Sequence, residues 1–334
     1  MDRRGHRQSR LAPDRRRASI AQVDRDRNSL PPWLQGVQEE LGRSAFSSLA
    51  ELQAHVDRRV AAYNAAPQAA LGGLSPNRMA ELLYGDWQAT GALRVNEALT
   101  LAELEPAPLL HNARMLLTAL QDAGPAQATA AGNLNRRFVR AMVDAMRWRE
   151  EFAADLREAN RQINEEDLLD LHMVRVLLEL IHLIRKRQGS FRITRAGRAA
   201  LEPSQAGPLY ARVFRTLFRG LNLDYLYRGW PNPAMQQTVA YTLYRLASAA
   251  EDWRATAALA NHVLLPEVLE EERDQPQANE ATSGWGLWGR VLRPLEWLGV
   301  IEERRVQGSE PFAYHIEVRK TALYDRVLSF RFRG

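Results

Sequence analysis

The chain has 334 residues, of which 46% are hydrophobic and 25% are charged, so it can form a sizeable core and about two to three domains. It contains no cysteine, which excludes disulfides, thiolate nucleophiles and cysteine-ligated metals. No apolar run approaches the ~18 residues that a membrane span needs, and the arginine-rich start lacks the apolar stretch of a signal peptide. A cytoplasmic location without a membrane partner is therefore expected.

The formal net charge of +5 comes from the first 27 residues, which hold nine arginines against four aspartates. The rest of the chain is electrically balanced, so net charge by itself gives no support to nucleic-acid binding. Residues 1–30 have almost no apolar pattern and are predicted to be a disordered basic tail. A solvated tail and a non-specific phosphate-binding arm are both open interpretations of it.

Residues 31–103 are predicted to be an N-terminal helical segment. Apolar residues at spacings of three and four indicate one helix from Ser47 to Tyr63 and a second from Met79 to Leu83. Between them, Gly72-Gly73 suits a chain reversal, and Ser75-Pro76 suits the start of a helix.

The stretch from 55 to 84 weakly resembles the closing motif of integrase-type transposases, through Tyr63-Asn64 and the Leu-Gly-Gly turn that follows. Ala66 and Gln68 stand where that motif has Arg and His. The catalytic carboxylates of the family would need an upstream domain, for which the preceding residues leave no room. The resemblance therefore implies no strand-transfer chemistry, and an ordinary reversal between two helices explains the same residues. A similar turn occurs in long bacterial proteins of unassigned role.

Residues 87–105 are predicted to be an irregular link, and residues 104–205 to be one domain. An apolar helical face runs from Leu109 to Leu120 and stops at Gly124-Pro125, and Ala126–Thr129 suits a short strand. A second helix then turns apolar residues inward and three basic residues outward, namely Arg136, Arg137 and Arg140. Residues 147–164 are predicted to be an insertion.

The hydrophobic period changes within residues 165–201. Four apolar residues share a helix face, namely Leu171, Val174, Leu178 and Ile181. After the tight-turn pair Gln188-Gly189, Phe191 and Ile193 alternate with polar residues, as in a strand. Helix, strand, turn, strand and a short final helix resemble the second half of a winged helix, and residues 104–146 supply its first half. A helix packed on an ordinary β-hairpin would give the same pattern.

The rest of the chain repeats this organisation. Residues 206–270 are predicted to be a helical connector and residues 271–281 a solvent-exposed linker. Residues 282–334 resemble a second winged-helix segment, with a wing tip at 308–311 and with first helices drawn from 233–265. The predicted fold class is mainly α with small β-hairpins, in which tandem winged-helix-like modules are joined by the helical connector.

No catalytic, cofactor-binding or metal-binding site is predicted. Gly284 to Gly289 fits Gly-x-Gly-x-x-Gly, but a charged linker precedes it and two tryptophans would crowd a pyrophosphate. The glycines are therefore expected to permit close packing. The seven histidines fall in no metal-ligand spacing. The aromatic group Tyr225, Tyr227 and Trp230 is expected to be core or a helix-packing seam rather than a stacking platform for bases.

A nucleic-acid interface is the most concrete functional expectation. Its candidate phosphate-binding residues are Arg136, Arg137, Arg140, Arg185, Lys186, Arg187, Arg192 and Arg195. Against it, the predicted reading helix at 165–179 carries five carboxylates, namely Glu165, Glu166, Asp167, Asp170 and Glu179.

The predicted function is that of a non-catalytic DNA-associated or regulatory protein, with double-stranded DNA as its candidate partner. Two alternatives stay open. The winged helices could serve a protein-interaction or scaffold role, with another protein or a second copy as partner, because that fold is used in both ways. The chain could also be an enzyme whose active site cannot be recognised from the sequence.

Overall fold

The computed structural model describes residues 46–149, 152, 162–276, 278–279, 281–307 and 314–333. The chain divides into two compact units, Met1–Pro67 and Gln68–Gly334. The predicted basic tail, most of the predicted insertion and the predicted second wing tip lie outside the described residues.

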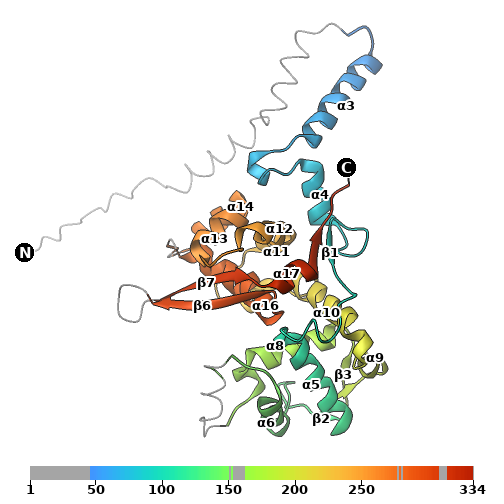
Figure 1. Ribbon diagram of the computed structural model, residues 1–334, viewed down its shortest axis with the longest axis vertical. Helices are drawn as coiled ribbons and strands as arrows, with labels where there is room; N and C mark the ends of the chain where they lie inside the picture. Colours follow the sequence, from blue (N-terminus) through green and yellow to red (C-terminus); the bar gives the residue numbers. More distant parts are fainter. Residues whose placement is uncertain are drawn as a thin grey trace, which may run out of the picture. The chain divides into compact units, whose positions relative to one another are not determined.

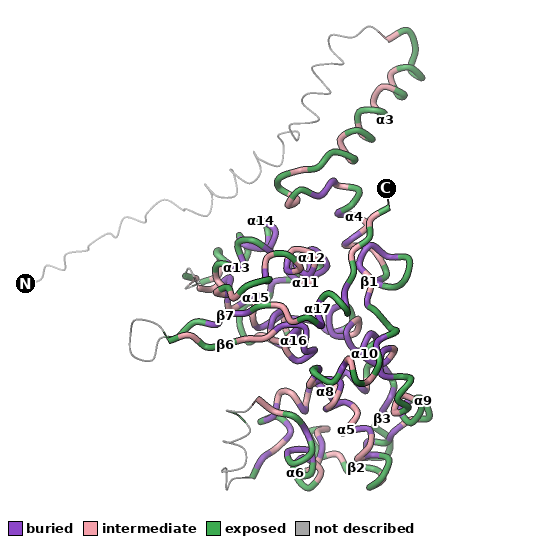
Figure 2. Tube along the Cα trace, viewed as in Figure 1, coloured by how far each residue is buried: buried purple, intermediate pink, exposed green. Residues whose placement is uncertain are grey.

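The described part of the first unit contains helix α3 (Leu49–Ala65). Ser48 caps this helix by accepting a hydrogen bond from the Glu51 amide. None of the residues of α3 is buried, as the green and pink tube in Figure 2 shows.

The second unit begins with η1 (Ala69–Leu71) and α4 (Pro76–Tyr84). Gly72 and Gly73 both have positive φ, 62° and 87°, so the predicted chain reversal uses a backbone conformation that glycine adopts without strain. Ser75 accepts a hydrogen bond from the Arg78 amide, and Pro76 occupies the first helical turn.

The first module, as we call residues 108–199, combines helices with a small sheet (Figure 1). Its elements are α5 (Pro108–Asp122), β2 (Ala126–Gln127), α6 (Arg136–Ala145), η2 (Glu165–Asp167), α8 (Leu169–Leu180), β3 (Ile184–Arg187), β4 (Ser190–Ile193) and α9 (Arg195–Ala199). The sheet is antiparallel, in the order β2-β4-β3. Gln188 and Gly189, with φ of 50° and 69°, form the predicted tight turn between β3 and β4.

A connector of short helices follows. Its elements are η3 (Pro203–Gln205), α10 (Ala206–Arg215), the π-helical turn η4 (Thr216–Gly220), η5 (Leu223–Leu226) and α11 (Pro233–Gln237). The loop between η5 and α11 closes on itself, because the Asn232 amide donates to Asp224 Oδ1 at 3.1 Å.

The second module, residues 239–320, has the same order of elements around its sheet as the first. Its elements are α12 (Val239–Ala249), β5 (Arg254–Ala255), α13 (Thr256–Val263), α14 (Pro266–Arg273), α15 (Thr282–Leu287), η6 (Trp288–Leu292), α16 (Arg293–Trp297), β6 (Ile301–Gln307) and β7 (Tyr314–Lys320). Its antiparallel sheet has the order β5-β7-β6, so in both modules the short first strand pairs with the last strand of the hairpin. Two segments complete the unit, α17 (Ala322–Val327) and β8 (Leu328–Phe330).

The predicted irregular link at 87–105 contains a strand. Strand β1 (Leu93–Val95) pairs antiparallel with β8, so that Leu93 lies opposite Phe330 (Figure 1). Trp87 is also buried, at 2% exposure. A three-residue strand shows too little alternation to be recognised locally, and its partner lies near the far end of the sequence.

The predicted exposed linker at 271–281 also differs from the structure. Helix α14 continues to Arg273, and the Glu272 side chain is completely buried. The polar composition suggested solvent exposure, but this carboxylate has a buried partner that is described below.

One continuous hydrophobic cluster extends through both modules and the connector. Tyr210 in the connector donates a hydrogen bond of 2.8 Å to the Leu298 carbonyl. Gly299, with φ of 73°, brings the second module so close to the segment before α5 that an added Cβ would lie 2.4 Å from the Pro106 carbonyl oxygen. The described fold is thus mainly α-helical with small antiparallel sheets, as predicted. None of its helices combines the length and the apolar character required to cross a bilayer.

Candidate nucleic-acid interface

The outer face of the first hairpin is basic. In an antiparallel pair, residues directly opposite each other point to the same side of the sheet. Arg185 lies opposite Arg192, and Arg187 lies two residues along β3 on that same face. All three side chains are exposed, and none forms an ion pair with a carboxylate in the described part of the chain.

Lys186 points to the opposite side of the hairpin. It lies opposite the buried Phe191, and its Nζ is 6.0 Å from the centre of the Phe191 ring. The same Nζ approaches Gly132, in the loop before α6, where an added Cβ would be 2.8 Å away. The four predicted hairpin cations therefore divide into three on the outer face and one on the side of the loop.

The predicted arginines of α6 are also exposed. Asn135 caps this helix and donates a hydrogen bond of 2.8 Å to the Gln127 carbonyl, which fixes the start of α6 beside β2. Since β2 and β3 are the two edges of the sheet, the α6 arginines and the β3 arginines lie toward opposite edges. Arg136 donates to Asn164 Oδ1 at 2.9 Å, whereas Arg137 and Arg140 form no ion pair with a described residue.

Arg195 is the first residue of α9, directly after the cap residue Thr194. Its side chain is exposed. It therefore follows the hairpin in the chain but does not belong to the strand face that carries Arg185 and Arg192.

The carboxylates predicted to repel phosphates are mostly neutralised or turned inward. Glu165 is completely buried and lies 2.6 Å from Arg175 Nε, and Arg175 also pairs with Glu179. Among the five carboxylates, the exposed ones are Glu166 and Asp167 at the start of the segment. The repulsion expected along residues 165–179 is therefore largely reduced to η2, before the start of α8.

Glu165 is the centre of a hydrogen-bonded network. Its Oε2 accepts from the Leu134 amide at 2.5 Å, and its Oε1 lies 2.7 Å from His172 Nδ1. Burial alone would raise the pKa of Glu165, but hydrogen bonds from His172, from the Leu134 amide and from Arg175 outweigh it and lower the pKa. His172 Nε2 in turn lies 2.6 Å from the Tyr225 hydroxyl, so the network joins the first module to the connector.

The outer face of the second hairpin has the opposite character. Arg304 lies opposite Glu317 and Arg319 lies opposite Glu302, and both cross-strand pairs form ion pairs, at 2.6 and 2.5 Å. The two guanidinium groups also lie over the Trp253 ring, at 4.5 and 4.8 Å from its centre. Positive charge on this face is therefore compensated within the sheet.

The glycine motif at 284–289 lies in α15 and η6 and packs against other elements. An added Cβ would be 2.6 Å from the Ala257 amide nitrogen at Gly284, 2.3 Å from Glu272 Oε2 at Gly286, and 2.5 Å from Tyr227 at Gly289. These glycines permit close packing, as predicted, and the helical backbone does not form a phosphate loop.

Arg290, next to this motif, is completely buried. Its Nε lies 2.7 Å from Asp224 Oδ1 and its Nη1 lies 3.2 Å from Glu272 Oε1. It also donates to the Trp230 carbonyl, and its guanidinium lies 4.5 Å from the centre of the Tyr227 ring. Tyr225 in η5 is 56% exposed but packs against His172 of α8, with ring centres 5.9 Å apart. Trp230 is 55% exposed, so the expectation of core or a helix-packing seam fails for Trp230.

A third polar cluster joins the two modules. Arg149, after α6, donates to Glu296 Oε2 at 2.9 Å and also pairs with Glu303, whose other oxygen accepts from Trp288 Nε1. Burial raises the pKa of Glu296 to about 6, and Arg149 only partly opposes this. Burial likewise raises the pKa of Asp170, which lies near Arg149.

The raised pKa of Glu296 predicts a pH-dependent stability difference. The folded state favours the protonated acid, so protonation of Glu296 contributes to the free energy of unfolding. This stabilising contribution is fully present below the usual pKa of 4.5 and is lost as the pH rises through about 6. Glu296→Gln cannot ionise, so its free energy of unfolding should gain about 2 kcal/mol on that of the wild type between pH 4.5 and 7. Urea unfolding at these two pH values measures this gain.

A matched control is Glu105→Gln, which removes an exposed carboxylate that also pairs with an arginine, Arg147. This variant should differ from the wild type by less than about 0.5 kcal/mol at both pH values. An equal gain in both variants would contradict the assignment to Glu296.

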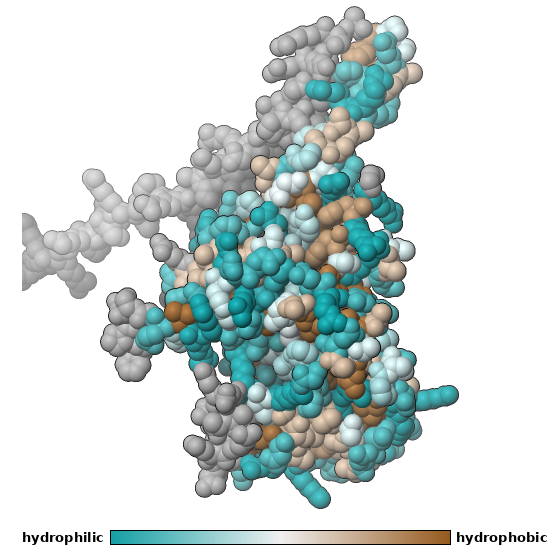
Figure 3. All heavy atoms as spheres, viewed as in Figure 1, coloured by the Kyte–Doolittle hydropathy of each residue, from teal (hydrophilic) through white to brown (hydrophobic). Residues whose placement is uncertain are grey.

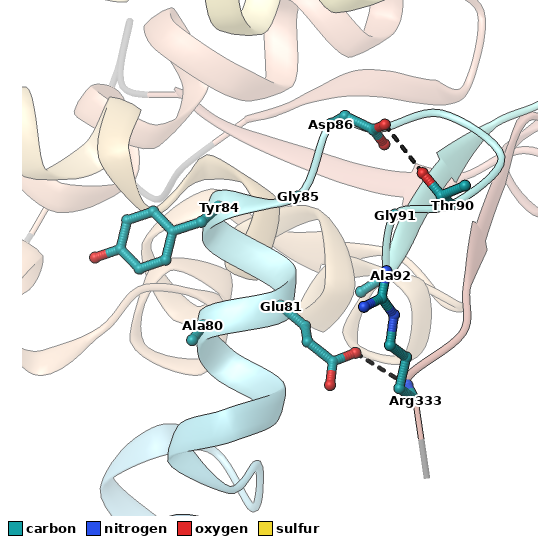
Figure 4. Close-up of a pocket in the computed structure, with 9 residues that line it drawn as sticks. All are labelled: Ala80, Glu81, Tyr84, Gly85, Asp86, Thr90, Gly91, Ala92 and Arg333. Carbon is teal, nitrogen blue, oxygen red and sulfur yellow. Dashed lines mark hydrogen bonds between the residues drawn. The ribbon is translucent and has the colours of Figure 1, made fainter.

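A pocket of about 330 Å³ lies where α4, the loop before β1 and Arg333 meet (Figure 4). Glu81 accepts a hydrogen bond from the Arg333 amide at 2.9 Å, and Asp86 accepts from the Gln88 amide and from Thr90. The Gln88 amide is the main cause of the lowered pKa of Asp86. Figure 4 shows the Tyr84 ring directed away from these groups. The two carboxylates hold the pocket walls together, so we assign no ligand to it.

Within the described ranges, no group of three or more His, Asp or Glu side chains is placed to hold a metal ion. The three buried networks around Glu165, Arg290 and Glu296 were not predicted from the sequence. One signal was present, because Arg290 stands between Trp288-Gly289 and Val291-Leu292 in an apolar run. A lone charge in such a run indicates a buried partner.

Residues 105–206, from just before α5 to the start of α10, match the family model described as the Y4jL N-terminal domain. The match covers the whole first module, including the basic hairpin. No curated protein and no solved structure matches the chain significantly.

Proposed function

We propose that the protein is a non-catalytic, DNA-associated protein whose first module is a winged helix that lays its hairpin along DNA phosphates. The order of elements and the sheet order β2-β4-β3 support this fold assignment. We also propose that the second module is a winged helix, because it repeats both features with β5-β7-β6.

One observation carries the proposal, namely the cross-strand pair of Arg185 and Arg192. Like charges directly opposite each other destabilise a sheet, and opposite charges stabilise it. At the corresponding face of the second module, both arginines lie opposite glutamates and pair with them. The same topology thus carries compensated charge in one module and uncompensated charge in the other. An anionic partner such as a phosphate backbone would supply the missing compensation.

The distribution of acids agrees with this partner. Glu165 and Glu179 are engaged by Arg175, so a large part of the negative charge of the segment before the hairpin does not face outward. Arg137 and Arg140 on α6 add exposed positive charge to the same module. Phosphate contacts of this kind give affinity and register but no sequence preference.

The test replaces Arg185, Lys186, Arg187 and Arg192 together with alanine. If these residues contact phosphates, binding to duplex DNA should be lost near physiological salt. The magnitude of the slope of log K against log salt should also fall by about 3, because each of the three arginines on the outer face contributes about 0.9. Fluorescence anisotropy with a labelled duplex across a salt titration measures both quantities, and circular dichroism checks that the fold is intact.

Two double variants give a matched comparison. The variant Arg185→Gln with Arg192→Gln removes the two arginines that lie opposite each other without a carboxylate. The variant Arg304→Gln with Arg319→Gln removes the two arginines of the second sheet that each pair with a glutamate. The first should weaken duplex binding and lower the salt slope, and the second should leave both nearly unchanged. Equal effects of the two variants, or unchanged affinity of the fourfold variant, would remove the proposal.

A scaffold role is the second candidate, and one observation favours it. Trp230 is exposed on the loop between η5 and α11, where its carbonyl accepts a hydrogen bond from Arg290, and exposed aromatic residues on a rigid support are typical of protein contacts. On the face shown in Figure 3, apolar residues are scattered among hydrophilic ones rather than gathered in one patch. Salt-insensitive self-association, lost in Trp230→Ala and retained in the fourfold hairpin variant, would favour this role over DNA binding.

A further inference from the structure

A second pocket, of about 640 Å³, lies over the β1–β8 ribbon. Residues from both strands and from the segments around them line it, among them Val95, Val327 and Leu328. Val95 and Leu328 lie opposite each other in the ribbon, and all three side chains are at most 5% exposed, so the ribbon beneath the pocket is held by the core.

Two arginines face this pocket from the same side of the ribbon. Arg94 lies directly opposite Ser329, and Arg331 is two residues beyond Ser329, so strand alternation places all three on one face. Arg94 Nε donates to the Gly91 carbonyl at 2.9 Å, which anchors the guanidinium and leaves its two terminal nitrogens available. The Arg331 amide donates to the Ala92 carbonyl at 2.7 Å, which extends the ribbon to this residue.

The charges around the pocket do not balance. Its two acids are engaged elsewhere, because Glu97 pairs with Arg215 at 2.6 Å and Asp325 pairs with Lys320 at 2.8 Å. A third arginine of the lining, Arg326, pairs with Glu103. Arg94 and Arg331 form no ion pair with any residue in the described ranges. Two positive charges therefore face a cavity whose own acids pair with other cations, with Lys320 shared between Asp325 and Glu251.

We propose that this pocket binds the phosphate group of a small molecule. A guanidinium matches the oxygens of a phosphate through two parallel hydrogen bonds, and two guanidiniums on one face would hold a dianion. The Ser329 hydroxyl and the side-chain amide of Gln88 can supply further donors from the same lining. The cavity has room for more than the phosphate itself, so the ligand is a phosphorylated compound rather than a free ion. The site lies outside the basic hairpin and does not depend on DNA binding.

The experiment uses the full chain and inorganic pyrophosphate as the probe, with ionic strength held constant by sodium chloride. The wild type should show saturable binding by calorimetry and a saturable rise in Tm. Arg94→Gln with Arg331→Gln should abolish both. Arg331→Gln alone should weaken binding at least tenfold. This single variant also protects the test against misfolding, because the Arg331 side chain is exposed and forms no hydrogen bond or ion pair with a described residue.

The matched control is Arg185→Gln with Arg192→Gln, which removes the same charge from the hairpin and should leave pyrophosphate binding unchanged. Citrate tests whether a carboxylate replaces the phosphate, and tighter binding of citrate would overturn the phosphate assignment. Non-saturable binding, or equal loss in the pocket and hairpin variants, would show a general charge effect and overturn the site. Loss of duplex affinity in the pocket variant, without any pyrophosphate binding by the wild type, would assign the two arginines to DNA instead.

Discussion

Arg290→Ala is expected to destabilise the protein by about 3–5 kcal/mol, since it removes one partner from a buried charge network. The Glu272 carboxylate would stay completely buried with no positive charge beside it, and Asp224 would lose the contact at 2.7 Å. The Trp230 carbonyl would lose its guanidinium donor, so the loop that carries Trp230 should also become more mobile. Urea unfolding measures the first effect, and amide hydrogen exchange of residues 223–232 measures the second.

The loss should depend on pH and on the charge of Glu272. Burial already raises the pKa of Glu272, and a protonated carboxyl needs no counter-charge, so Arg290→Ala should cost less at pH 5 than at pH 8. The double variant Arg290→Met with Glu272→Leu replaces both buried charges by apolar groups and should recover most of the stability. A loss that is independent of pH and equal in the single and double variants would contradict a charge network and indicate a packing effect.

Glu165→Ala is expected to cost about 3 kcal/mol or more, because one buried carboxylate serves three donors. The Leu134 amide, His172 and Arg175 would all lose their acceptor. Arg175 keeps Glu179, which limits the loss. The His172–Tyr225 contact should also loosen, so Tyr225 fluorescence or its hydrogen-bond shift by NMR should change together with the unfolding free energy.

Glu166→Ala is the matched control, one residue further along. Its carboxylate is exposed and accepts one hydrogen bond of 3.2 Å, from Asn133. Its removal should change the unfolding free energy by about 0.5 kcal/mol or less. Glu165→Gln keeps a hydrogen-bond acceptor but not the charge. Its loss of unfolding free energy should lie between those of Glu165→Ala and Glu166→Ala. If Glu165→Ala and Glu166→Ala were equally mild, the network would have no role in stability.

Local patterns were sufficient to predict the first hairpin. The change of hydrophobic period near Ile184 and the pair Gln188-Gly189 predicted two strands and a tight turn, and both are present. The reason is that period and turn chemistry act over a few neighbouring residues. The exposed positions of Arg185, Arg187 and Arg192 follow from the same alternation, whereas Lys186 falls on the other face for the same reason.

The contacts that join distant segments could not be predicted in this way. Strand β1 is three residues long and pairs with β8, and the buried partners of Glu272 and Arg290 lie in other elements. At Glu272 the polar composition of the segment led to a wrong prediction of solvent exposure, because a polar segment usually faces solvent. Such partners depend on the fold as a whole, and a single sequence carries little local sign of them.

The β1–β8 ribbon has a consequence for synthesis of the chain. Asn96, just after β1, bonds to the Arg326 carbonyl 230 residues away, and Leu93 lies opposite Phe330. On the ribosome, β1 cannot pair with β8 until all the intervening residues have been translated, whereas the first module can fold much earlier. Until then this edge is open to other nascent chains, and its brevity, with a charged arginine at its centre, limits that hazard.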